Sequence, residues 1–381
     1  MKNPFIITGN IPEKYFCDRR EEAAKIVRTL SNGGNICLMS PRRMGKSKLV
    51  NFCYDRPEIT ANFYTFYIDI LHTSGLREFT YVFGQKVFDV LHSRSQKMFT
   101  VLVQGLKSIN AKFGFDPINN TPTFNIELGD ISKPEYTLTE IFDCLEQADK
   151  PCIVAFDEFQ QIMKYPEKNV ETLLRSHIQQ LSNVYFIFSG SERHLVSEMF
   201  LSSARPFYNS TSIMELHPIK SEIYTNFVCG LFNEFDKSVE GNDVMKVYDV
   251  FEGNTYYMQK TFHEAFINTA EGGTCSLSIL RQTIDSILEE AGDGYRLLLS
   301  RIPERQKELL YAIATEGKAE KIMSAAFVRK YSLLSASSVQ AALKKLMELD
   351  LLTVENGLYY IPDILFRMYL LRLKDRNREL I

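Results

Sequence analysis

Eight residues near the start of the chain have the types and spacing needed to bind phosphate. They run Ser40-Pro41-Arg42-Arg43-Met44-Gly45-Lys46-Ser47, directly after an apolar run and directly before a helical pattern. This is the form of a phosphate-binding loop, except that Ser40 stands where the first glycine is usual. Gly45 would let the backbone approach phosphate, Lys46 can reach the β and γ phosphates, and the Ser47 hydroxyl can bind Mg²⁺. With Lys48, these are the candidate nucleotide-binding residues.

Two acidic residues much later in the chain could take part in the same chemistry. The apolar run Cys152-Ile153-Val154-Ala155-Phe156 ends in Asp157 and Glu158. Asp157 could hold Mg²⁺ through its water shell, and Glu158 could act as a base that orients or deprotonates an attacking water. Taken alone, Lys46 also fits a solvated lysine at a helix start, and the two acids fit a loop pair or a helix cap. Their joint occurrence in this order predicts binding of ATP with Mg²⁺.

The elements that must position these residues are short apolar runs separated by helical patterns. Strands are expected at residues 35–39, 63–70, 152–156, 184–188 and 212–216. These runs are apolar almost throughout, as in parallel strands covered on both faces. Helices are expected at residues 19–32, 46–54, 77–110 and 138–147, and a surface loop at about 114–132. The pattern predicts an α/β fold, the parallel-sheet sandwich of a P-loop NTPase.

The second half of the chain has a different pattern. Residues 221–300 are helical with glycine breaks. Helices are then expected at about 303–315, 324–331 and 335–349, followed by a hairpin around Glu355-Asn356-Gly357, which is the order of a winged helix. The sequence therefore predicts three domains: a P-loop ATPase core at 1–220, a helical lid at 221–300 and a winged-helix domain at 301–381.

Composition limits the class of protein. Of 381 residues, 45% are hydrophobic and 24% charged, which excludes a disordered or fibrous chain. The formal net charge of -3 gives no overall attraction to nucleic acid or to an anionic membrane. Seven cysteines without a C-x-x-C pair argue against a disulfide framework and against a zinc site. No apolar run is long enough to cross a membrane, so a cytoplasmic protein with no membrane partner is expected.

Several motifs together resemble the archaeal-type AAA ATPases, which lie close to the STAND and origin-recognition branches of the AAA+ superfamily. They are the opening Phe16-Cys17-Asp18-Arg19-Arg20-Glu21-Glu22, the SPRRMGKS loop, the VAFDE strand, the later FSGS and the carboxyl-terminal winged helix. The resemblance covers nearly the whole chain. It implies that Phe16 and Arg19 lie beside the nucleotide. A core phenylalanine and a surface arginine at a helix entry remain the alternative.

The resemblance also implies two further catalytic positions. A sensor hydroxyl that contacts the γ phosphate is expected at Ser189 or Ser191, although a hydroxyl in a turn fits equally well. An arginine from a neighbouring subunit often completes such a site, yet the usual Y-G-R triplet is Tyr208-Asn209-Ser210 here. The role of this arginine is therefore taken by Arg205, taken by Arg193, or not filled in this chain. The lid segment Glu252-Gly253-Asn254-Thr255-Tyr256-Tyr257 resembles the family's G-G/N-P turn, with Thr255 in place of proline, and an ordinary helix end is the alternative.

Partners follow less directly from the sequence. Residues 301–381 carry 14 Lys and Arg against 10 Asp and Glu, so any DNA contact is expected there. Ser337, Gln340, Lys344 and Lys345 are the outward positions of the third winged-helix helix. The main hypothesis is an ATPase that couples hydrolysis to movement of the lid and winged helix. The alternatives are a nucleotide-gated DNA-binding or signalling scaffold with little or no hydrolysis, and a winged-helix regulator with a protein partner. The sequence also leaves open whether the protein forms a homo-oligomer.

Overall fold

The computed structural model describes residues 3–9, 11–108, 112–116, 121–125, 128 and 131–375. These residues form two compact units. The amino-terminal body comprises residues 19–41 and 45–217, and the carboxyl-terminal body comprises residues 1–18, 42–44 and 218–381. Residues 42–44, the tip of the predicted phosphate-binding loop, thus belong to the carboxyl-terminal body.

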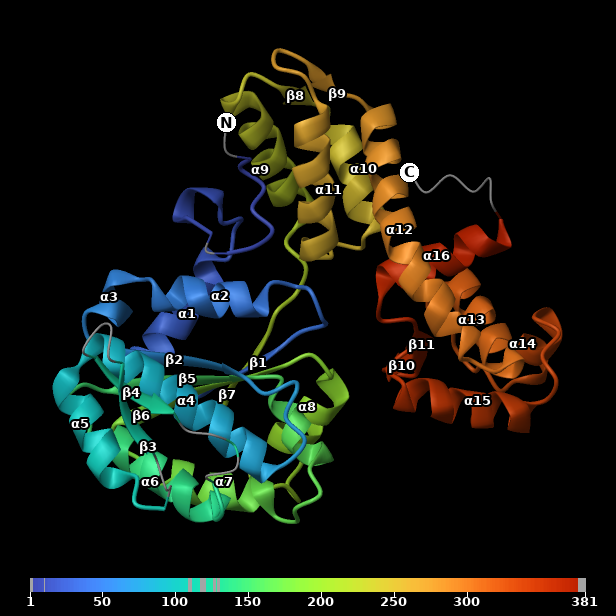
Figure 1. Ribbon diagram of the computed structural model, residues 1–381. Helices are drawn as coiled ribbons and strands as arrows, with labels where there is room; N and C mark the ends of the chain where they lie inside the picture. The colour runs from blue at the N-terminus through green and yellow to red at the C-terminus, as the bar shows by residue number, and fades with distance from the viewer. Residues whose placement is uncertain are drawn as a thin grey trace. The chain divides into compact units, whose positions relative to one another are not determined.

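A five-stranded parallel sheet forms the centre of the amino-terminal body (Figure 1), in the order β2-β5-β6-β1-β7. All five predicted strands are confirmed. Their bounds are β1 (Ile36–Met39), β2 (Tyr64–Asp69), β5 (Cys152–Asp157), β6 (Val184–Gly190) and β7 (Ser212–Glu215). Because the strands are parallel, the residues that follow β1, β5 and β6 emerge at the same edge of the sheet.

Helices cover both faces of this sheet. Figure 1 shows α1 (Arg20–Ser31) and α2 (Lys46–Tyr54) on one face, and α4 (Leu76–Arg94) and α6 (Pro134–Glu146) on the other. Further helical segments of this body are α3 (Pro57–Thr60), α5 (Gln96–Gly105), the 3-10 helix η3 (Phe159–Lys164), α7 (Val170–Ile178) and α8 (Arg193–Leu201). The single helix expected at 77–110 is in fact α4 and α5. The chain is extended at Ser95, whose side chain accepts a hydrogen bond from the Met98 amide and so caps α5.

Alternate residues of the strands pack into the two layers, as the period of a strand requires. On the face covered by α4 and α6, Phe156 of β5 packs with its ring centroid 5.2 Å from Phe79 and 5.1 Å from Phe83. Phe186 and Phe188 of β6 belong to the same buried cluster. This phenylalanine-rich layer fixes β5 and β6, the two strands that carry the candidate acids and hydroxyls at their ends.

A further expectation for the amino-terminal body was wrong. The loop expected at about 114–132 contains an antiparallel hairpin of β3 (Lys112–Asp116) and β4 (Thr121–Asn125). The segment KFGFD alternates aromatic residues with glycine or charged residues, which is the period of a strand. Because turn-forming residues surround this segment, the sequence analysis predicted a loop there instead of strands. Residues 117–120, 126–127 and 129–130 of the expected loop lie outside the described residues.

The carboxyl-terminal body is helical at first, as predicted. Its helices are α9 (Ser221–Glu234), α10 (Gly241–Val250), α11 (Thr255–Asn268) and α12 (Leu277–Ser300), and the 3-10 helix η1 (Glu13–Tyr15) precedes them in the chain. A short parallel pair, β8 (Ser238–Val239) and β9 (Thr274–Cys275), was not predicted. Phe5 is fully buried among Phe232, Phe262 and Phe266. The start of the chain is therefore part of this helical core.

The predicted winged helix is present: three helices and then a hairpin. They are α13 (Glu304–Glu316), α14 (Ala325–Lys330), α15 (Ala336–Glu348), β10 (Thr353–Glu355) and β11 (Leu358–Tyr360). A further helix, α16 (Ile364–Lys374), was not predicted. Leu349, the residue after the end of α15, is 56% exposed. The buried residues of the helical segment and of the winged helix form one continuous cluster.

Two observations concern the cysteines and the length of the helices. All seven cysteines are free thiols, and five of them are buried. Among the described residues, no helix is both long and apolar enough to cross a membrane.

Candidate nucleotide-binding site

The candidate loop joins β1 to α2, the junction that the sequence predicted. Gly45 is the residue before α2, and its φ of +88° is a left-handed conformation that glycine adopts without strain. A Cβ placed on Gly45 would meet no atom within 4 Å. The first amide groups of an α-helix carry its positive dipole end. Gly45 therefore turns the chain so that these amides can face an anion.

Lys46 is buried at the start of α2, with 6% of its surface exposed. Its ammonium donates hydrogen bonds to the carbonyl oxygens of Ser40, 3.2 Å away, and Pro41, 3.4 Å away. A buried ammonium requires such acceptors, because burial without them costs several kcal/mol. The ammonium thus lies against the first residues of its own loop, and the structure brings together Ser40, Pro41 and Lys46.

Asp157 is the centre of a second polar cluster at the end of β5. It is 5% exposed. Its Oδ2 accepts a hydrogen bond from the Ser47 hydroxyl at 2.9 Å and one from the Tyr67 hydroxyl. Its Oδ1 accepts hydrogen bonds from the Ser189 hydroxyl and from the Glu158 amide, the latter at 3.1 Å. Three predicted site residues, Ser47, Asp157 and Ser189, therefore meet in one cluster.

Tyr67 in this cluster was missed by the sequence analysis. It lies on β2 beside Ala155 of β5, two positions before the residue that pairs with Asp157. Burial, followed by the charge of Asp157, raises the pKa of the Tyr67 phenol well above its usual value. The phenol therefore stays protonated and donates to Asp157 at neutral pH. In the sequence, Tyr67 is one of several aromatic residues in an apolar run, and nothing there distinguishes it.

Glu158 is held in a different way from Asp157. It has a φ of +55°, a left-handed conformation that is strained for glutamate. Its Oε2 accepts hydrogen bonds from the Gln160 side-chain amide at 2.7 Å, the Ser191 hydroxyl at 2.6 Å and the Ser191 amide at 3.2 Å. The two candidate sensor hydroxyls thus have different partners, since Ser189 contacts Asp157 and Ser191 contacts Glu158.

The donor set fits a magnesium ion. The Ser47 hydroxyl and the Asp157 carboxylate are oxygen ligands, the type that Mg²⁺ prefers, and their oxygens lie 2.9 Å apart. No group of three or more His, Cys, Asp or Glu side chains that could hold a metal occurs among the described residues. Mg²⁺ is commonly held by one or two protein ligands together with phosphate and water. Ser47 and Asp157 would supply those protein ligands.

Phe16 and Arg19 were expected beside the nucleotide. Arg19 is 6% exposed and precedes α1, where its guanidinium donates to Glu22 and to the His217 carbonyl oxygen, both at 2.7 Å. Phe16 follows η1 in the carboxyl-terminal body and is partly buried. Arg19 is therefore a buried structural contact of its own body, and a position of either residue beside adenine stays a prediction.

The two candidate finger arginines both form ion pairs within the amino-terminal body. Arg205 donates to Glu198, 3.1 Å from its Nε, and to Glu171, 3.2 Å from its Nη1. Burial raises the pKa of the Glu171 carboxyl, and the charge of Arg205 opposes that shift. Arg193 pairs with Glu215. A catalytic role in a neighbouring subunit stays a prediction for both arginines, and these ion pairs would have to open for it.

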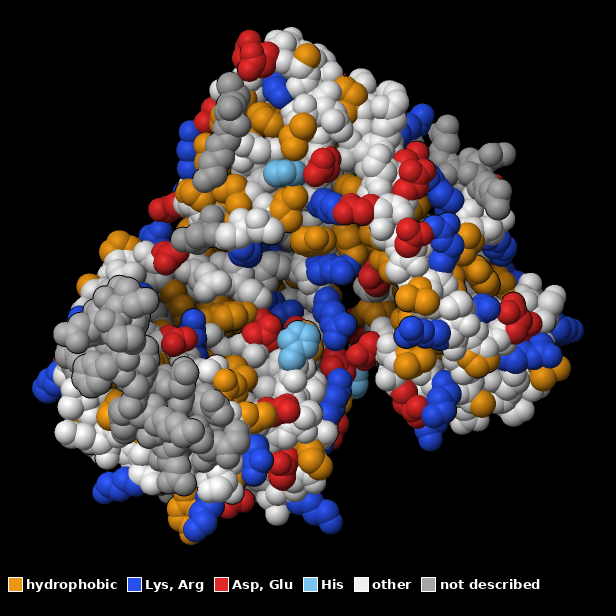
Figure 2. Space-filling view, viewed as in Figure 1, with side chains coloured by type: hydrophobic (Ala, Val, Ile, Leu, Met, Phe, Trp, Pro, Cys, Tyr) orange, Lys and Arg blue, Asp and Glu red, His pale blue; other side chains and the backbone are white. Residues whose placement is uncertain are grey.

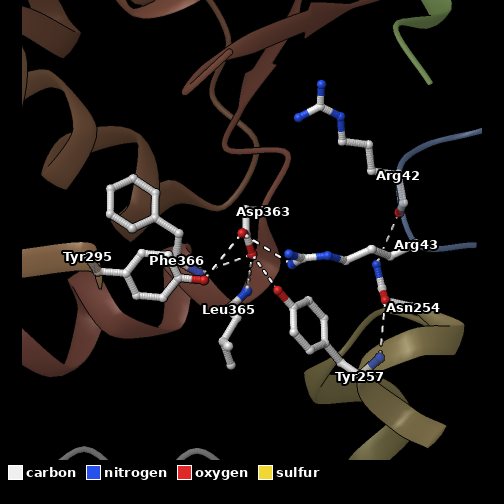
Figure 3. Close-up of polar contacts among 8 residues, drawn as sticks. All are labelled: Arg42, Arg43, Asn254, Tyr257, Tyr295, Asp363, Leu365 and Phe366. Carbon is white, nitrogen blue, oxygen red and sulfur yellow. Dashed lines mark hydrogen bonds and ion pairs between the residues drawn. The ribbon is translucent and has the colours of Figure 1, made fainter. Parts of the chain in front are cut away.

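The tip of the candidate loop has its partners in the carboxyl-terminal body (Figure 3). Arg43 has a φ of +66°, and its guanidinium lies 3.3 Å from Oδ2 of Asp363, just before α16. Arg42 pairs with Asp350 at 3.8 Å. Arg42 and Arg43 were predicted among the nucleotide-binding residues of the loop, and that stays a prediction; in this structure their guanidinium groups face acidic residues. Met44 is buried, and Lys48 is half-buried.

Comparison with known proteins places this arrangement in a family. Residues 16–261 match the model of an "ATPase domain predominantly from Archaea", and residues 293–372 match that of a "probable winged helix domain". No curated protein matches the chain.

Several solved structures resemble nearly the whole chain. The Walker-type ATPase paby2304 of Pyrococcus abyssi has a TM-score of 0.67 at 20% identity, over 96% of this chain and 99% of that one. The ORC2 protein of Aeropyrum pernix, solved as ADPNP-ADP complexes, has a TM-score of 0.60 at 16% identity, over 99% of both chains. At these identities the likeness shows the P-loop NTPase fold. Because the first family model spans well over half of the residues, the chain belongs to the family of ATPase domains found predominantly in Archaea.

Proposed function

We propose that the protein binds ATP with Mg²⁺ and hydrolyses it. The observation that carries this proposal is the hydrogen bond between Ser47, in the phosphate-binding loop, and Asp157, at the end of β5. It joins the two motifs that the chemistry needs. Lys46 and the α2 amides supply positive charge beside them. The ADPNP and ADP complexes of the similar Aeropyrum pernix protein support a nucleotide as the ligand.

Each residue has a definite part in the proposed reaction. Lys46 would leave the Ser40 and Pro41 carbonyls and bind the β and γ phosphates, and the α2 amides would hold the remaining phosphate oxygens. Ser47 and Asp157 would hold Mg²⁺, which when bound neutralises charge on the phosphates. Glu158 would orient the attacking water and accept its proton. Its hydrogen bonds to Gln160 and Ser191 fix where that carboxylate lies before the nucleotide binds.

Equilibrium binding of ATP and ADP tests the first part of this proposal. We expect the wild-type protein to bind both in the presence of Mg²⁺ and Lys46→Ala to lose binding, because the variant lacks the ammonium that neutralises the phosphates. Lys133→Ala is the matched control, since Lys133 also lies at a helix start, that of α6, but outside the site. Equal binding by wild type and Lys46→Ala would contradict the proposal.

We further propose that hydrolysis moves the helical lid, residues 221–300, and the winged helix, residues 301–381, relative to the core at 1–220. A ligand can shift such an equilibrium only through contacts that differ between the two arrangements. The γ phosphate is the group that hydrolysis removes, so it is the proposed source of that difference. The free cysteines support a reducing, cytoplasmic location for this activity.

A second candidate function is a nucleotide-gated DNA-binding or signalling scaffold with little turnover. Ser337, Gln340, Lys344 and Lys345 are exposed on α15, as predicted, and would face a DNA groove. Against this, Lys345 pairs with Glu348 at 2.8 Å and Lys330 with Glu316 at 2.5 Å. Figure 2 shows basic and acidic side chains intermixed over the viewed face of the winged helix. Phosphate contacts favour clustered basic residues, so DNA binding is the weaker proposal.

Phosphate release measured with and without DNA, at two salt concentrations, separates the candidates. Release without DNA supports the ATPase. Salt-sensitive DNA binding without release supports the scaffold, because displacement of counterions makes DNA binding depend on salt. If neither phosphate release nor salt-sensitive DNA binding is observed, the experiment favours a regulator whose partner is a protein. A rate per subunit that rises with protein concentration would indicate a homo-oligomer.

A further inference from the structure

One carboxylate of the carboxyl-terminal body receives hydrogen bonds from four separate parts of the chain (Figure 3). Oδ1 of Asp363 accepts from the Tyr257 hydroxyl at 3.0 Å and from the first amides of α16, those of Leu365 and Phe366. Its Oδ2 accepts from the Tyr295 hydroxyl at 3.2 Å and from Arg43 at 3.3 Å. Asp363 thus joins the start of α16, two lid helices and the tip of the phosphate-binding loop.

Arg43 has a conformation that requires such support. Its φ of +66° is left-handed, which costs free energy for any residue with a Cβ. Three contacts oppose that cost. The Arg43 carbonyl oxygen accepts a hydrogen bond from the Tyr256 amide at 3.1 Å, and its guanidinium lies 4.9 Å from the centre of the Tyr257 ring. The third contact is the ion pair with Asp363.

The lid turn that contacts Arg43 is itself held by α16. Arg367 of α16 pairs with Glu252 of this turn at 2.6 Å. Asn254 caps α11 by accepting a hydrogen bond from the Tyr257 amide, and its side-chain amide approaches the Arg42 carbonyl oxygen at 3.5 Å. Tyr257 then reaches Asp363. The side chain of Asp363 and the backbone amide of Tyr256 therefore both hold Arg43, and the side chain of Asn254 contacts the residue before it.

We propose that Asp363 is a positioning residue for the nucleotide site: through Arg43 it holds the tip of the phosphate-binding loop in the left-handed conformation that phosphate binding uses. This rests on the proposed function, because it assumes that the loop binds phosphate. Gly45 and Lys46 follow the held residues directly in the chain, so the conformation at Arg43 limits where the loop amides point. Winged-helix residue Asp363 would in this way set nucleotide affinity without touching nucleotide.

The variant Asp363→Asn tests this proposal while keeping α16 capped, because asparagine caps helices as well as aspartate does. It removes the charge that holds Arg43. We expect ADP to bind about tenfold more weakly by calorimetry, a loss of ~1.4 kcal/mol. Glu316→Gln is the matched control, since Glu316 also accepts hydrogen bonds from a basic side chain, Lys330, and from a tyrosine, Tyr331. This control should bind ADP as the wild type does.

Asp363→Asn combined with a second substitution, Arg43→Gly, shows whether Asp363 acts through Arg43. Glycine adopts positive φ without strain, so a loop with Arg43→Gly has no need of the ion pair. In that background, Asp363→Asn should change ADP affinity by less than about twofold, in line with a coupled pair of residues. The same tenfold loss in both backgrounds, or wild-type affinity in Asp363→Asn alone, would overturn the proposal.

Amide hydrogen exchange without nucleotide separates this inference from the proposed function. We expect residues 42–47 to exchange several-fold faster in Asp363→Asn than in wild type or Glu316→Gln, because the loop tip loses a constraint. If the wild type binds no nucleotide, the proposed function fails, and exchange still decides whether Asp363 orders the loop. If the wild type binds nucleotide and exchange at residues 42–47 is unchanged, only the positioning role fails.

Discussion

The Ser47 hydroxyl donates a hydrogen bond to Oδ2 of Asp157 over 2.9 Å, although 110 residues separate them. Parallel strands produce this meeting. β1 leads into the loop that carries Ser47, β5 ends in Asp157, and both strands pair with β6, which lies between them. The carboxyl ends of all three strands therefore lie at one edge of the sheet, where ligands bind in open α/β folds.

Tyr67 is predicted to stabilise this cluster. Tyr67→Phe keeps the ring and removes a hydroxyl that donates to Asp157. Hydrogen bonds to charged groups contribute about 1.5–3 kcal/mol, so we expect the free energy of unfolding to fall by about that amount. Denaturant unfolding without nucleotide measures it. Tyr185→Phe is the control, because the Tyr185 hydroxyl makes an exposed bond to a carbonyl oxygen. An equal fall in the free energy of unfolding in the two variants would show that the hydrogen bond to Asp157 contributes no more than an exposed one.

The sequence alone predicted the elements that carry this cluster, and part of the cluster itself. The five strands are continuous apolar runs, a pattern that local sequence displays fully, and Ser47 and Asp157 stand at recognisable strand ends. Tyr67 was not predictable, because its role depends on which strand lies beside β5. The pairing of β2 with β5 joins residues that are distant in the chain, and the local sequence FYTFYIDI does not indicate it.

The absence of a side chain at Gly190 is predicted to keep Glu158 in place. A Cβ there would collide with Oε1 of Gln160 and would lie 2.5 Å from Cγ2 of Val196. Gln160 donates to Glu158, so Gly190→Ala should displace the amide that orients the proposed base. We expect stability to fall by about 1–3 kcal/mol and phosphate release to slow, with ATP affinity nearly unchanged. Unchanged release at wild-type stability would exclude a positioning role for Gln160.

Arg205 offers a choice between two roles. Its ion pairs with Glu171 and Glu198 predict that Arg205→Ala destabilises the protein, because Glu171 is half-buried and would lose its cationic partner. Thermal unfolding measures this loss, and phosphate release per subunit should stay within about twofold of wild type at temperatures where the variant is folded. A much larger loss of release, at unchanged stability, would instead support an arginine finger.

The buried thiols are predicted to be inert. Burial raises the pKa of Cys144 to about 12, and burial, opposed by the charge of Arg56, raises that of Cys53 to about 12. The thiolate is the reactive form, so these groups stay unreactive at pH 8 while the protein is folded. In a thiol titration, we expect the partly exposed Cys17 and Cys229 to react first. The other five should react only in denaturant, and rapid reaction of all seven in the native state would contradict the described packing.

The contacts made by the tip of the phosphate-binding loop, Arg42 and Arg43, were not predictable from the sequence. Arg42 and Arg43 were predicted as nucleotide-binding residues because they lie inside the loop motif, and that stays a prediction, but their ion pairs were not predicted. Their acidic partners, Asp350 and Asp363, are more than 300 residues away in the chain. Asp363 also caps α16, a helix that was not predicted. Without that helix, no pattern in the sequence identified Asp363 as a partner of the loop.

Glu158→Gln is the measurement that tests the central claim most directly. Glutamine keeps the shape of the side chain and cannot accept a proton, so the account predicts unchanged ATP binding and phosphate release reduced by a factor of about 10² or more. ATP affinity and phosphate release should be measured on the same preparation with Mg²⁺. ATP bound and hydrolysed by wild type, but only bound by Glu158→Gln, is the predicted result. Release at the wild-type rate in Glu158→Gln, or no ATP binding by wild type, would contradict the account.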